Sequence, residues 1–464
     1  MHQKPSTIGE LRSTEYKVLS VKEEMRKNLI SKLKRREQIF PDIIGYEDSV
    51  IPQLENAILA GHDIMFIGER GQAKTRLIRS LINLLDEEVP IVKGSEINDN
   101  PYAPASKLRD IVNSLGNDTE ISWIKREDRY GEKLATPDVS IADLIGEVDP
   151  IKVAEGRYLS DELTIHFGLI PRSNRGIFAI NELPDLVEKV QVGLFNIMEE
   201  NDIQIKGYKI RLPLDICIVA TANPEDYTNR GRIITPLKDR FQAQIRTHYP
   251  ATIEDEIKIM KQEARILPRD GYCVKVPKFI KNIIAEITFQ ARASHEINQR
   301  SGVSVRTTIA NYETMIANAE KRAINIGERE VAPRITDLPA LIPSTAGKIE
   351  LEYLGEDTSE VNVIDNLINR AIKNVFDSYF PTHNIFPELL ESFEHGYVEV
   401  ANTMPSDEYL VGLKEIKGLE KCINRLEIDG SSAETASAIE LILEGLHLSN
   451  KLNKEIVQGK IIYR

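Results

Sequence analysis

Short apolar runs alternate with amphipathic segments over residues 42–247. Three of the runs are only four or five residues long, at positions 64–67, 177–180 and 216–220. Between them, apolar residues recur every three or four positions, which is the period of an amphipathic helix. Continuous apolar strands separated by helices are typical of a parallel sheet that is buried on both faces. We therefore predict an α/β fold in which helices cover both sides of a parallel sheet.

A weaker, alternating pattern lies between the second and third runs. Apolar residues at every second position flank Lys206-Gly207, which predicts a β-hairpin. Beyond residue 250 the pattern becomes mostly helical, with strong helical stretches over 362–380 and about 433–455. Between the two helical regions we expect a linker, because prolines punctuate the chain at Pro333, Pro339 and Pro343.

These patterns divide the chain into four parts. We predict an N-terminal helical arm over 1–40, an α/β core over 41–247, a helical region over 248–345 and a mostly helical C-terminal domain over 346–464. The length of 464 residues agrees with this division, since a domain usually takes roughly 100–200 residues.

Composition and charge narrow the class of protein. The net charge of -13 disfavours non-specific binding to nucleic acid or to an anionic membrane, so a protein partner is the better expectation. The chain has no apolar run of about 18 residues and no apolar leader, which predicts a location in the cytoplasm. Its three cysteines lie far apart, so neither a disulfide framework nor a cysteine-rich zinc site is expected.

The segment after the first apolar run nearly fits the phosphate-binding loop pattern G-x-x-x-x-G-K-[ST]. It reads Gly68-Glu69-Arg70-Gly71-Gln72-Ala73-Lys74-Thr75, with alanine in place of the second patterned glycine. The loop amides and the following helix would face phosphates, Lys74 would reach the β- and γ-phosphates, and Thr75 would ligate Mg²⁺. Alanine at position 73 is tolerable if its φ is negative, whereas a positive φ would cost about 1–2 kcal/mol.

The other two runs also end in polar residues. The second leads into Asn181-Glu182, which resembles a Walker B segment with asparagine at the usual aspartate position. Asn181 would accept a hydrogen bond from a metal-bound water without adding charge, and Glu182 would polarise the attacking water. The third run leads into Asn223, which would orient water or contact the γ-phosphate, since ligands of open α/β sheets bind at the carboxyl ends of the strands.

The order of these motifs resembles AAA+ ATPases of the helix-2-insert group, especially the magnesium-chelatase motor subunit and MoxR-type relatives. The resemblance covers roughly residues 40–330. Besides the motifs above, it rests on an entry segment at 43–47, a Gly-Leu-Ile-…-Asn-Arg-Gly run at 168–176, Leu-Lys-Asp-Arg-Phe at 237–241 and a sensor-2 segment at 301–306.

The resemblance implies roles for individual residues. Ile44 in the entry segment would lie beside adenine, and Arg76 would join residues 68–75 in binding the nucleotide. Arg240 would be the arginine finger that reaches the ATP of a neighbouring subunit, with Arg230 or Arg232 as alternatives nearby in sequence. Arg306 would be the sensor-2 arginine of a helical lid at 248–345 and would contact the γ-phosphate in the same subunit or across the interface.

The function implied is that of a Mg²⁺-dependent ATPase that forms a homo-oligomeric ring of six subunits. Such a ring would remodel, mature or load metal into a protein partner, and relatives often work with a separate von Willebrand A-domain protein. An alternative is a nucleotide-binding scaffold with little hydrolysis, because Ala73 and Asn181 both depart from the standard motifs. Chelatase activity on a tetrapyrrole is a third possibility that the motor motifs do not decide. No H-E-x-x-H or G-x-S-x-G motif supports another hydrolase.

Overall fold

The structure of the chain is a computed structural model. It describes residues 4–148, 165–200, 202–204, 211–224, 231–267, 271–299, 301–352, 359–381, 386–394, 396–413 and 416–464. Contacts divide the chain into two compact units, Met1–His248 and Tyr249–Arg464.

A five-stranded sheet forms the centre of the first unit. Its order is β11 (Ala243–Arg246), β1 (Ile64–Ile67), β10 (Ile216–Ala222), β7 (Gly176–Asn181) and β4 (Tyr130–Leu134). All four neighbouring pairs run parallel. The three strands predicted from apolar runs therefore lie side by side in the middle, and the predicted parallel α/β sheet is confirmed. The two edge strands, β4 and β11, are more polar and were not predicted.

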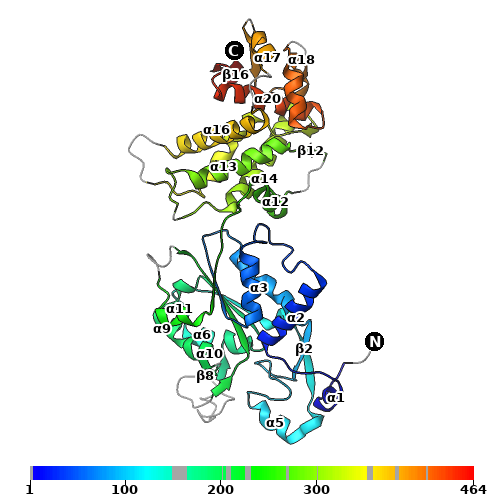
Figure 1. Ribbon diagram of the computed structural model, residues 1–464, viewed down its shortest axis with the longest axis vertical. Coiled ribbons are helices and arrows are strands. Elements are labelled where there is room, and N and C mark those ends of the chain that lie inside the picture. The colour runs from blue at the N-terminus through cyan, green and yellow to red at the C-terminus, as the bar shows by residue number, and fades with distance from the viewer. Residues whose placement is uncertain are drawn as a thin grey trace. The chain divides into compact units, whose positions relative to one another are not determined.

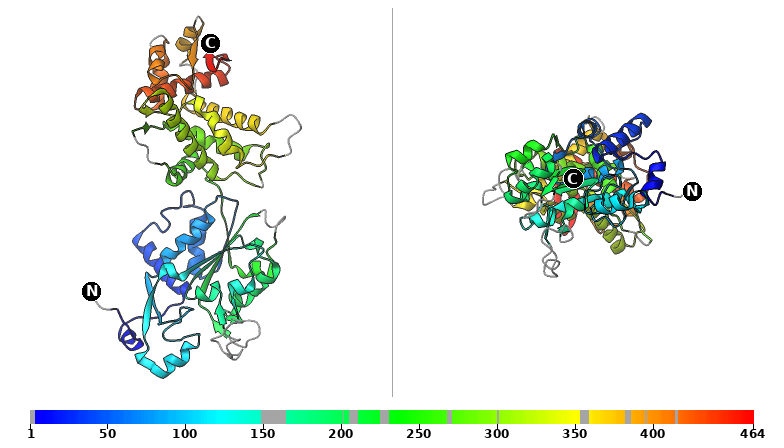
Figure 2. Two further views of the ribbon diagram at one scale, coloured as in Figure 1. Left: turned by 180° about the vertical axis from the view of Figure 1, so that it is seen from behind. Right: turned by 90° about the horizontal axis from the view of Figure 1, so that it is seen from below.

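Helices cover both faces of this sheet (Figure 1). Alternate residues of β7 enter two different cores, because successive strand side chains point to opposite faces. One face packs on α2 (Val21–Arg35), α3 (Val50–Ala60) and α4 (Lys74–Ser80). The other packs on α6 (Ile141–Leu144), α8 (Leu169–Arg172), α9 (Glu188–Gly193), α10 (Phe195–Glu200) and α11 (Thr235–Arg240). Figure 2 shows the same layers from behind, with the blue helices on one side and the green helices on the other.

Antiparallel pairs extend the first unit. Strands β2 (Glu88–Val92) and β3 (Ile121–Lys125) form a ribbon, α5 (Leu108–Leu115) lies between them in sequence and at the end of the ribbon in Figure 1, and α1 (Ile8–Ser13) lies near it. A second pair joins β5 (Gly146–Val148) to β6 (Ile165–Phe167). The predicted hairpin is confirmed in its strands, β8 (Asp202–Gln204) and β9 (Arg211–Pro213). Its expected turn, Lys206-Gly207, lies outside the described residues.

The second unit is mostly helical and has one extended hydrophobic core. Its long helices are α12 (Ile253–Glu263), α13 (Lys278–Ala293), α14 (Val305–Ile326), α16 (Glu360–Tyr379) and α20 (Ser432–Leu448). Shorter helices are α15 (Ile342–Ala346), α17 (Pro387–Phe393), α18 (Ser406–Leu413) and α19 (Leu419–Ile423). Two small sheets accompany them: β12 (Cys273–Val274) with β13 (Glu330–Val331), and the antiparallel set β14 (Val398–Val400), β16 (Lys460–Tyr463) and β15 (Lys454–Val457).

Two expectations for this unit need correction, and one is confirmed. The proline-rich stretch is not a linker: it forms a 3₁₀ helix at Ile335–Leu341 followed by α15, and Leu338 and Leu341 are buried in the core. The helix expected over about 433–455 ends at Leu448, because Asn450 adopts a left-handed conformation and the chain turns into β15. The helix expected over 362–380 is present as α16, with its predicted apolar face buried. Among the described residues, no helix has the length and apolarity needed to cross a membrane.

Candidate functional site: a phosphate-binding loop at the carboxyl edge of the sheet

The loop between β1 and α4 lies at the carboxyl edge of the sheet. Glycine suits its first position, because a Cβ on Gly68 would lie 1.9 Å from the Thr247 hydroxyl and 2.3 Å from Gln72 Oε1, and both side chains would have to move. Gln72 closes the loop from within: its Oε1 accepts hydrogen bonds from the Glu69 amide at 3.0 Å and from the Thr247 hydroxyl at 2.7 Å. The loop is therefore held in shape by residue 72 and by the residue after β11. Neither role was visible in the linear motif.

Ala73 adopts the costlier of the two conformations considered for it. Its φ is +54° and its ψ is 16°, a left-handed conformation that glycine adopts easily and alanine does not. The chain turns here to enter α4, which begins at the next residue. The cost is about 1–2 kcal/mol.

Lys74 joins the loop to the two neighbouring strand ends. Its Nζ donates to the carbonyls of Gly68 and Glu69, the latter at 2.8 Å, and to Asn223 Oδ1 at 2.7 Å. Asn223 in turn donates from Nδ2 to Glu182 Oε2 at 2.6 Å. Three residues expected from separate motifs thus form one chain of hydrogen bonds across β1, β10 and β7.

Glu182 is held in an unusual backbone conformation. Its φ is +57°, and its amide donates to the Thr221 hydroxyl on β10 at 2.9 Å. A non-glycine residue in this region carries strain of order 1–3 kcal/mol and persists only where its surroundings fix it. Strain of this kind gathers at functional sites, so the conformation supports a functional interpretation of Glu182.

Asn181 lies at the end of β7 and is buried. Its Nδ2 donates to Glu132 Oε1 at 2.7 Å, whereas its Oδ1 is buried without a hydrogen-bond partner within the described part of the chain. Glu132 lies on β4 and also forms a two-pronged ion pair with Arg79 of α4, at 2.9 Å for both bonds. The hydrogen bond from Arg79 lowers the pKa of Glu132, so this carboxylate is ionised at neutral pH.

The residues around Asn181 fit a magnesium ion. An orphaned buried acceptor is costly, and it would be satisfied by a water molecule of a metal's hydration shell. Thr75, in the first turn of α4, offers a hydroxyl oxygen, which is the kind of ligand that Mg²⁺ prefers. Thr75 and Asn181 therefore stay the proposed metal residues.

The entry segment packs against the loop. The Tyr46 hydroxyl lies 2.9 Å from the Gln72 carbonyl and 2.8 Å from the His248 carbonyl, and Arg76 donates to the Asp42 carbonyl at 3.4 Å. Burial raises the pKa of Tyr46, which keeps its hydroxyl protonated. The structure thus brings the segment that contains Ile44 to the loop, whereas the roles of Ile44, Arg70 and Arg76 at the nucleotide stay predictions.

The candidate arginines are placed differently. Arg240, the last residue of α11, forms an ion pair with Glu199 and lies over the Phe195 ring with 4.5 Å between its Cζ and the ring centre. Arg232 is exposed, and Arg230 lies outside the described residues. Arg306 is an exposed residue in the first turn of α14, in the second unit. The roles of these arginines at the nucleotide stay predictions.

The run at 168–176 has a structural function. It precedes β7 and so lies at the amino edge of the sheet, opposite the loop. Asn174 donates to the Ile97 carbonyl at 2.9 Å and Arg175 donates to the Pro90 carbonyl at 2.6 Å, while a Cβ on Gly176 would lie 1.8 Å from the Arg129 carbonyl. These contacts lock the ribbon and the sheet together.

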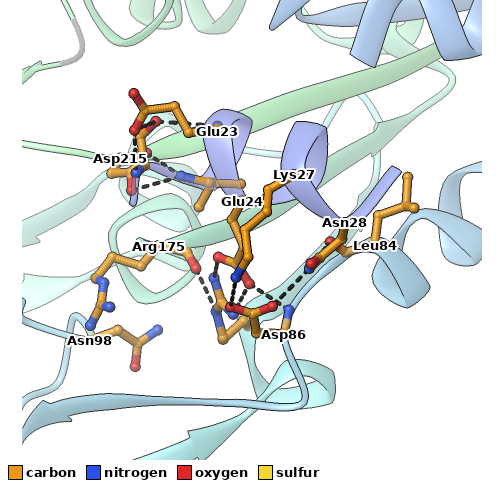
Figure 3. A network of polar contacts seen from close by, with 12 residues as sticks. Glu23, Glu24, Lys27, Asn28, Leu84, Asp86, Asn98, Arg175 and Asp215 are labelled. Carbon is orange, nitrogen blue, oxygen red and sulfur yellow. Dashed lines mark hydrogen bonds and ion pairs between the residues drawn. The ribbon is translucent and has the colours of Figure 1, made fainter. Parts of the chain in front are cut away.

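A buried ion pair anchors α2 at the same edge. Arg129 is 1% exposed and binds Glu24 through two hydrogen bonds of 2.8 and 2.6 Å. Arg129 Nε donates to the Arg175 carbonyl, and the Asp86 amide donates to Glu24. Figure 3 shows Glu24, Asp86 and Arg175 converging in this network. The charged helix α2 therefore belongs to the first unit, and its apolar residues lie in the core of that unit.

The geometry supports phosphate chemistry. A glycine-bearing loop, a buried lysine and a strained glutamate meet where the three central strands end, which is where open α/β sheets bind ligands. Sequence reasoning missed Glu132, Arg79 and Thr247, and it placed Gln72 at the nucleotide without predicting that its side chain holds the loop. The only signal for Arg79 was its position four residues after Thr75, on the same side of the helix, and no local signal pointed to Glu132 or Thr247.

Comparison with known proteins agrees with the motifs. The chain is similar to the magnesium-chelatase subunit ChlI of Mesostigma viride, with 26% identity over 231 residues that cover 48% of this chain and 61% of that protein. It is also similar to the chloroplastic subunit ChlI-2 of Arabidopsis thaliana, with 25% identity over 231 residues that cover 49% of this chain and 52% of that protein. No family model matches the chain.

The matched region spans a little over half of each of these relatives, and the resemblance to magnesium-chelatase subunits of the AAA+ class is confirmed. Among solved structures, a complex of the magnesium-chelatase subunits BchI and BchD aligns with a TM-score of 0.37 and 19% identity, covering 68% of this chain and 96% of that chain. A score this low carries no conclusion about activity or assembly.

Proposed function

We propose that this relative of the ChlI subunits is an AAA+ motor that binds and hydrolyses ATP. The observation that carries the proposal is the hydrogen-bonded chain from Lys74 through Asn223 to Glu182. It joins the phosphate-binding lysine to the residue expected to polarise water. An ordinary strand-to-helix turn would not need a buried lysine directed at a second strand end.

Each residue has a definite task in this proposal. Lys74 exchanges its bonds to the loop carbonyls for bonds to the β- and γ-phosphates, because a phosphate oxygen is a stronger acceptor than a carbonyl. Glu182 accepts a hydrogen bond from the attacking water and so polarises it. Asn223 holds the Glu182 carboxylate in a position facing the γ-phosphate. Thr75 and Asn181 hold Mg²⁺, which when bound supplies positive charge to the phosphate oxygens.

The assembly and the client belong to the same proposal. We expect a homo-oligomeric ring of six subunits, in which Arg240 leaves Glu199 to reach the ATP of the neighbouring subunit and Arg306 contacts the γ-phosphate from the helical lid. Nucleotide-dependent movement of the lid would remodel, mature or load metal into a protein partner. A von Willebrand A-domain protein is the partner class implied by the resemblance.

The first test measures nucleotide affinity and oligomer size together. Lys74→Ala should lower ATP affinity by about tenfold or more, because it removes a charge-assisted contact with the phosphates. It should also abolish any ATP-dependent increase in mass measured by light scattering. Lys93→Ala is the matched control, because Lys93 forms an exposed ion pair with Glu120 beside the β2–β3 ribbon and is not part of the loop. Equal ATP affinity in wild type and Lys74→Ala would refute the proposed site.

A nucleotide-binding scaffold is the second candidate. It is favoured by the strained Ala73 and by the absence of a carboxylate at position 181. In that case ATP would stabilise the ring only by binding to it, without turnover. Glu182→Gln separates the two candidates: the motor loses hydrolysis and biological activity while ATP binding persists, whereas the scaffold keeps its biological activity unchanged.

A further inference from the structure

The hydrogen bond between Glu132 and Asn181 has no role in the function proposed above. Glu132 lies on the edge strand β4, and its carboxylate bridges Arg79 of α4 and Asn181 of β7. Asn181 follows Ile177 and Ala179 at alternate positions of β7, so its side chain points to the sheet face that α4 covers. Arg79 lies one helical turn after Thr75, so both predicted metal residues touch or flank the Glu132–Arg79 pair.

The chemistry of these groups fixes the orientation of the Asn181 amide. An ionised carboxylate only accepts hydrogen bonds, so the part of Asn181 that faces Glu132 must be its NH₂ group. The amide oxygen is therefore forced to the other side, where it is buried and has no partner among the described residues. A buried acceptor left in this state indicates a donor that comes with the ligand.

The same contact explains why position 181 carries asparagine. An aspartate there would place a second carboxylate at the hydrogen-bond distance of 2.7 Å from Glu132, and two like charges this close oppose one another. Asparagine removes the repulsion and keeps an acceptor oxygen. The departure from the Walker B pattern is thus linked to a residue about fifty positions earlier in the chain.

We propose that Glu132, braced by Arg79, is a positioning residue that turns the Asn181 oxygen toward the hydration shell of the nucleotide-bound Mg²⁺. This inference rests on the proposed function, because it assigns the metal side of the same site. Glu132 does not touch the nucleotide. Its effect is transmitted through one hydrogen bond to Asn181.

The test is a double-mutant cycle between positions 132 and 181, read in two ways. The first readout is the thermal midpoint of the protein without nucleotide. The second is the affinity for a fluorescent, non-hydrolysable ATP analogue, measured with Mg²⁺ and again with EDTA. The gain in affinity on adding Mg²⁺ isolates the metal contribution, so a general loss of folding or of nucleotide binding does not imitate it. Glu120→Gln is the matched control, since it removes an exposed ion pair on the ribbon.

Glu132→Gln should reduce the Mg²⁺-dependent gain about tenfold and leave the affinity in EDTA unchanged, as expected for a residue that orients a metal-binding group. Asn181→Asp should also reduce the gain and should lower the thermal midpoint, because two carboxylates then face one another. In both readouts the double variant should lose less than the two single losses added together, since the glutamine introduced on β4 can donate to the aspartate introduced on β7. Recovery is incomplete because the same glutamine amide then faces the Arg79 donor. Glu120→Gln should change neither.

Several results would overturn the inference. Losses that simply add in the double variant would show that the two positions do not act through one contact. If Mg²⁺ raises the affinity of Glu132→Gln for the ATP analogue as much as it raises that of wild type, the orientation of Asn181 does not depend on Glu132. If Glu132→Gln does not fold, the inference is tested by Asn181→Asp alone. A Mg²⁺-dependent gain in affinity that is larger in Asn181→Asp than in wild type refutes the inference. A wild type that shows no gain with Mg²⁺ refutes the proposed function instead, and the thermal midpoints still test the contact.

Discussion

Replacing Ala73 by glycine should stabilise the first unit. The alanine has a φ of +54°, and relief of that conformation contributes about 1–2 kcal/mol. Glycine also makes the unfolded chain more flexible, which offsets about 0.4–1 kcal/mol of the gain. Residue 73 is the N-cap of α4 and makes no side-chain cap, and glycine is the better residue there. The net expectation is a stabilisation of about 1 kcal/mol.

The assay is thermal unfolding of the full chain, followed by a probe of the first unit. For a unit of this size, about 1 kcal/mol corresponds to a rise of about 2–4 °C in its midpoint. Ala60→Gly is the control, because Ala60 is an exposed helical residue of α3 in the same unit. It should lower stability by about 0.5–1 kcal/mol. If Ala73→Gly destabilised the unit as much as Ala60→Gly, the account of backbone strain would be wrong.

Three further predictions concern burial and charge. Glu24→Ala should lower the free energy of unfolding in denaturant by about 3–5 kcal/mol, because it leaves Arg129 buried and unpaired; Glu120→Ala, at an exposed pair, should cost less than about 1 kcal/mol. Alkylation of the native protein at pH 8 should label Cys273 alone, since burial raises the pKa of Cys422 to about 11 and that of Cys217 to about 12; labelling of all three at one rate would contradict this. The hydrogen bond from Arg79 lowers the pKa of Glu132 below 4.5. Wild type should therefore be more stable than Glu132→Gln above about pH 4.5, and this difference should vanish as the pH falls through the folded-state pKa of Glu132. A constant difference in unfolding free energy from pH 3 to pH 7 would contradict this prediction.

The central strands and the loop were predictable because their signals are local. Strands β1, β7 and β10 are buried on both faces, so they appear as continuous apolar runs bounded by polar residues. The edge strands were not predictable in the same way. In β4 a tyrosine, a glycine, a glutamate and a lysine precede the last leucine, because one side of an edge strand is not covered by a neighbour.

Glu132 was not predicted as a site residue because its strand, β4, was not predicted. Glu132 acts at Asn181 only because β4 pairs with β7, and that pairing is set by tertiary packing and not by nearby sequence. The conformation of Ala73 was also beyond the motif, since a residue name does not report its φ. In the second unit, prolines were taken as signs of a linker, yet Pro339 and Pro343 lie in short helices in which Leu338, Leu341 and Thr345 are buried. Burial of neighbouring leucines outweighed the usual meaning of proline there.

Phosphate release from ATP by wild type and by Glu182→Gln, with Mg²⁺ present, tests the central claim most directly. The account predicts steady phosphate release by wild type and a rate at least about 10²-fold lower in Glu182→Gln, because a positioned general base contributes at least that much. ATP affinity, measured on the same samples, should be unchanged. Equal rates in the two proteins, or no release by wild type that binds ATP, would contradict the claim that Lys74, Asn223 and Glu182 form a hydrolytic site.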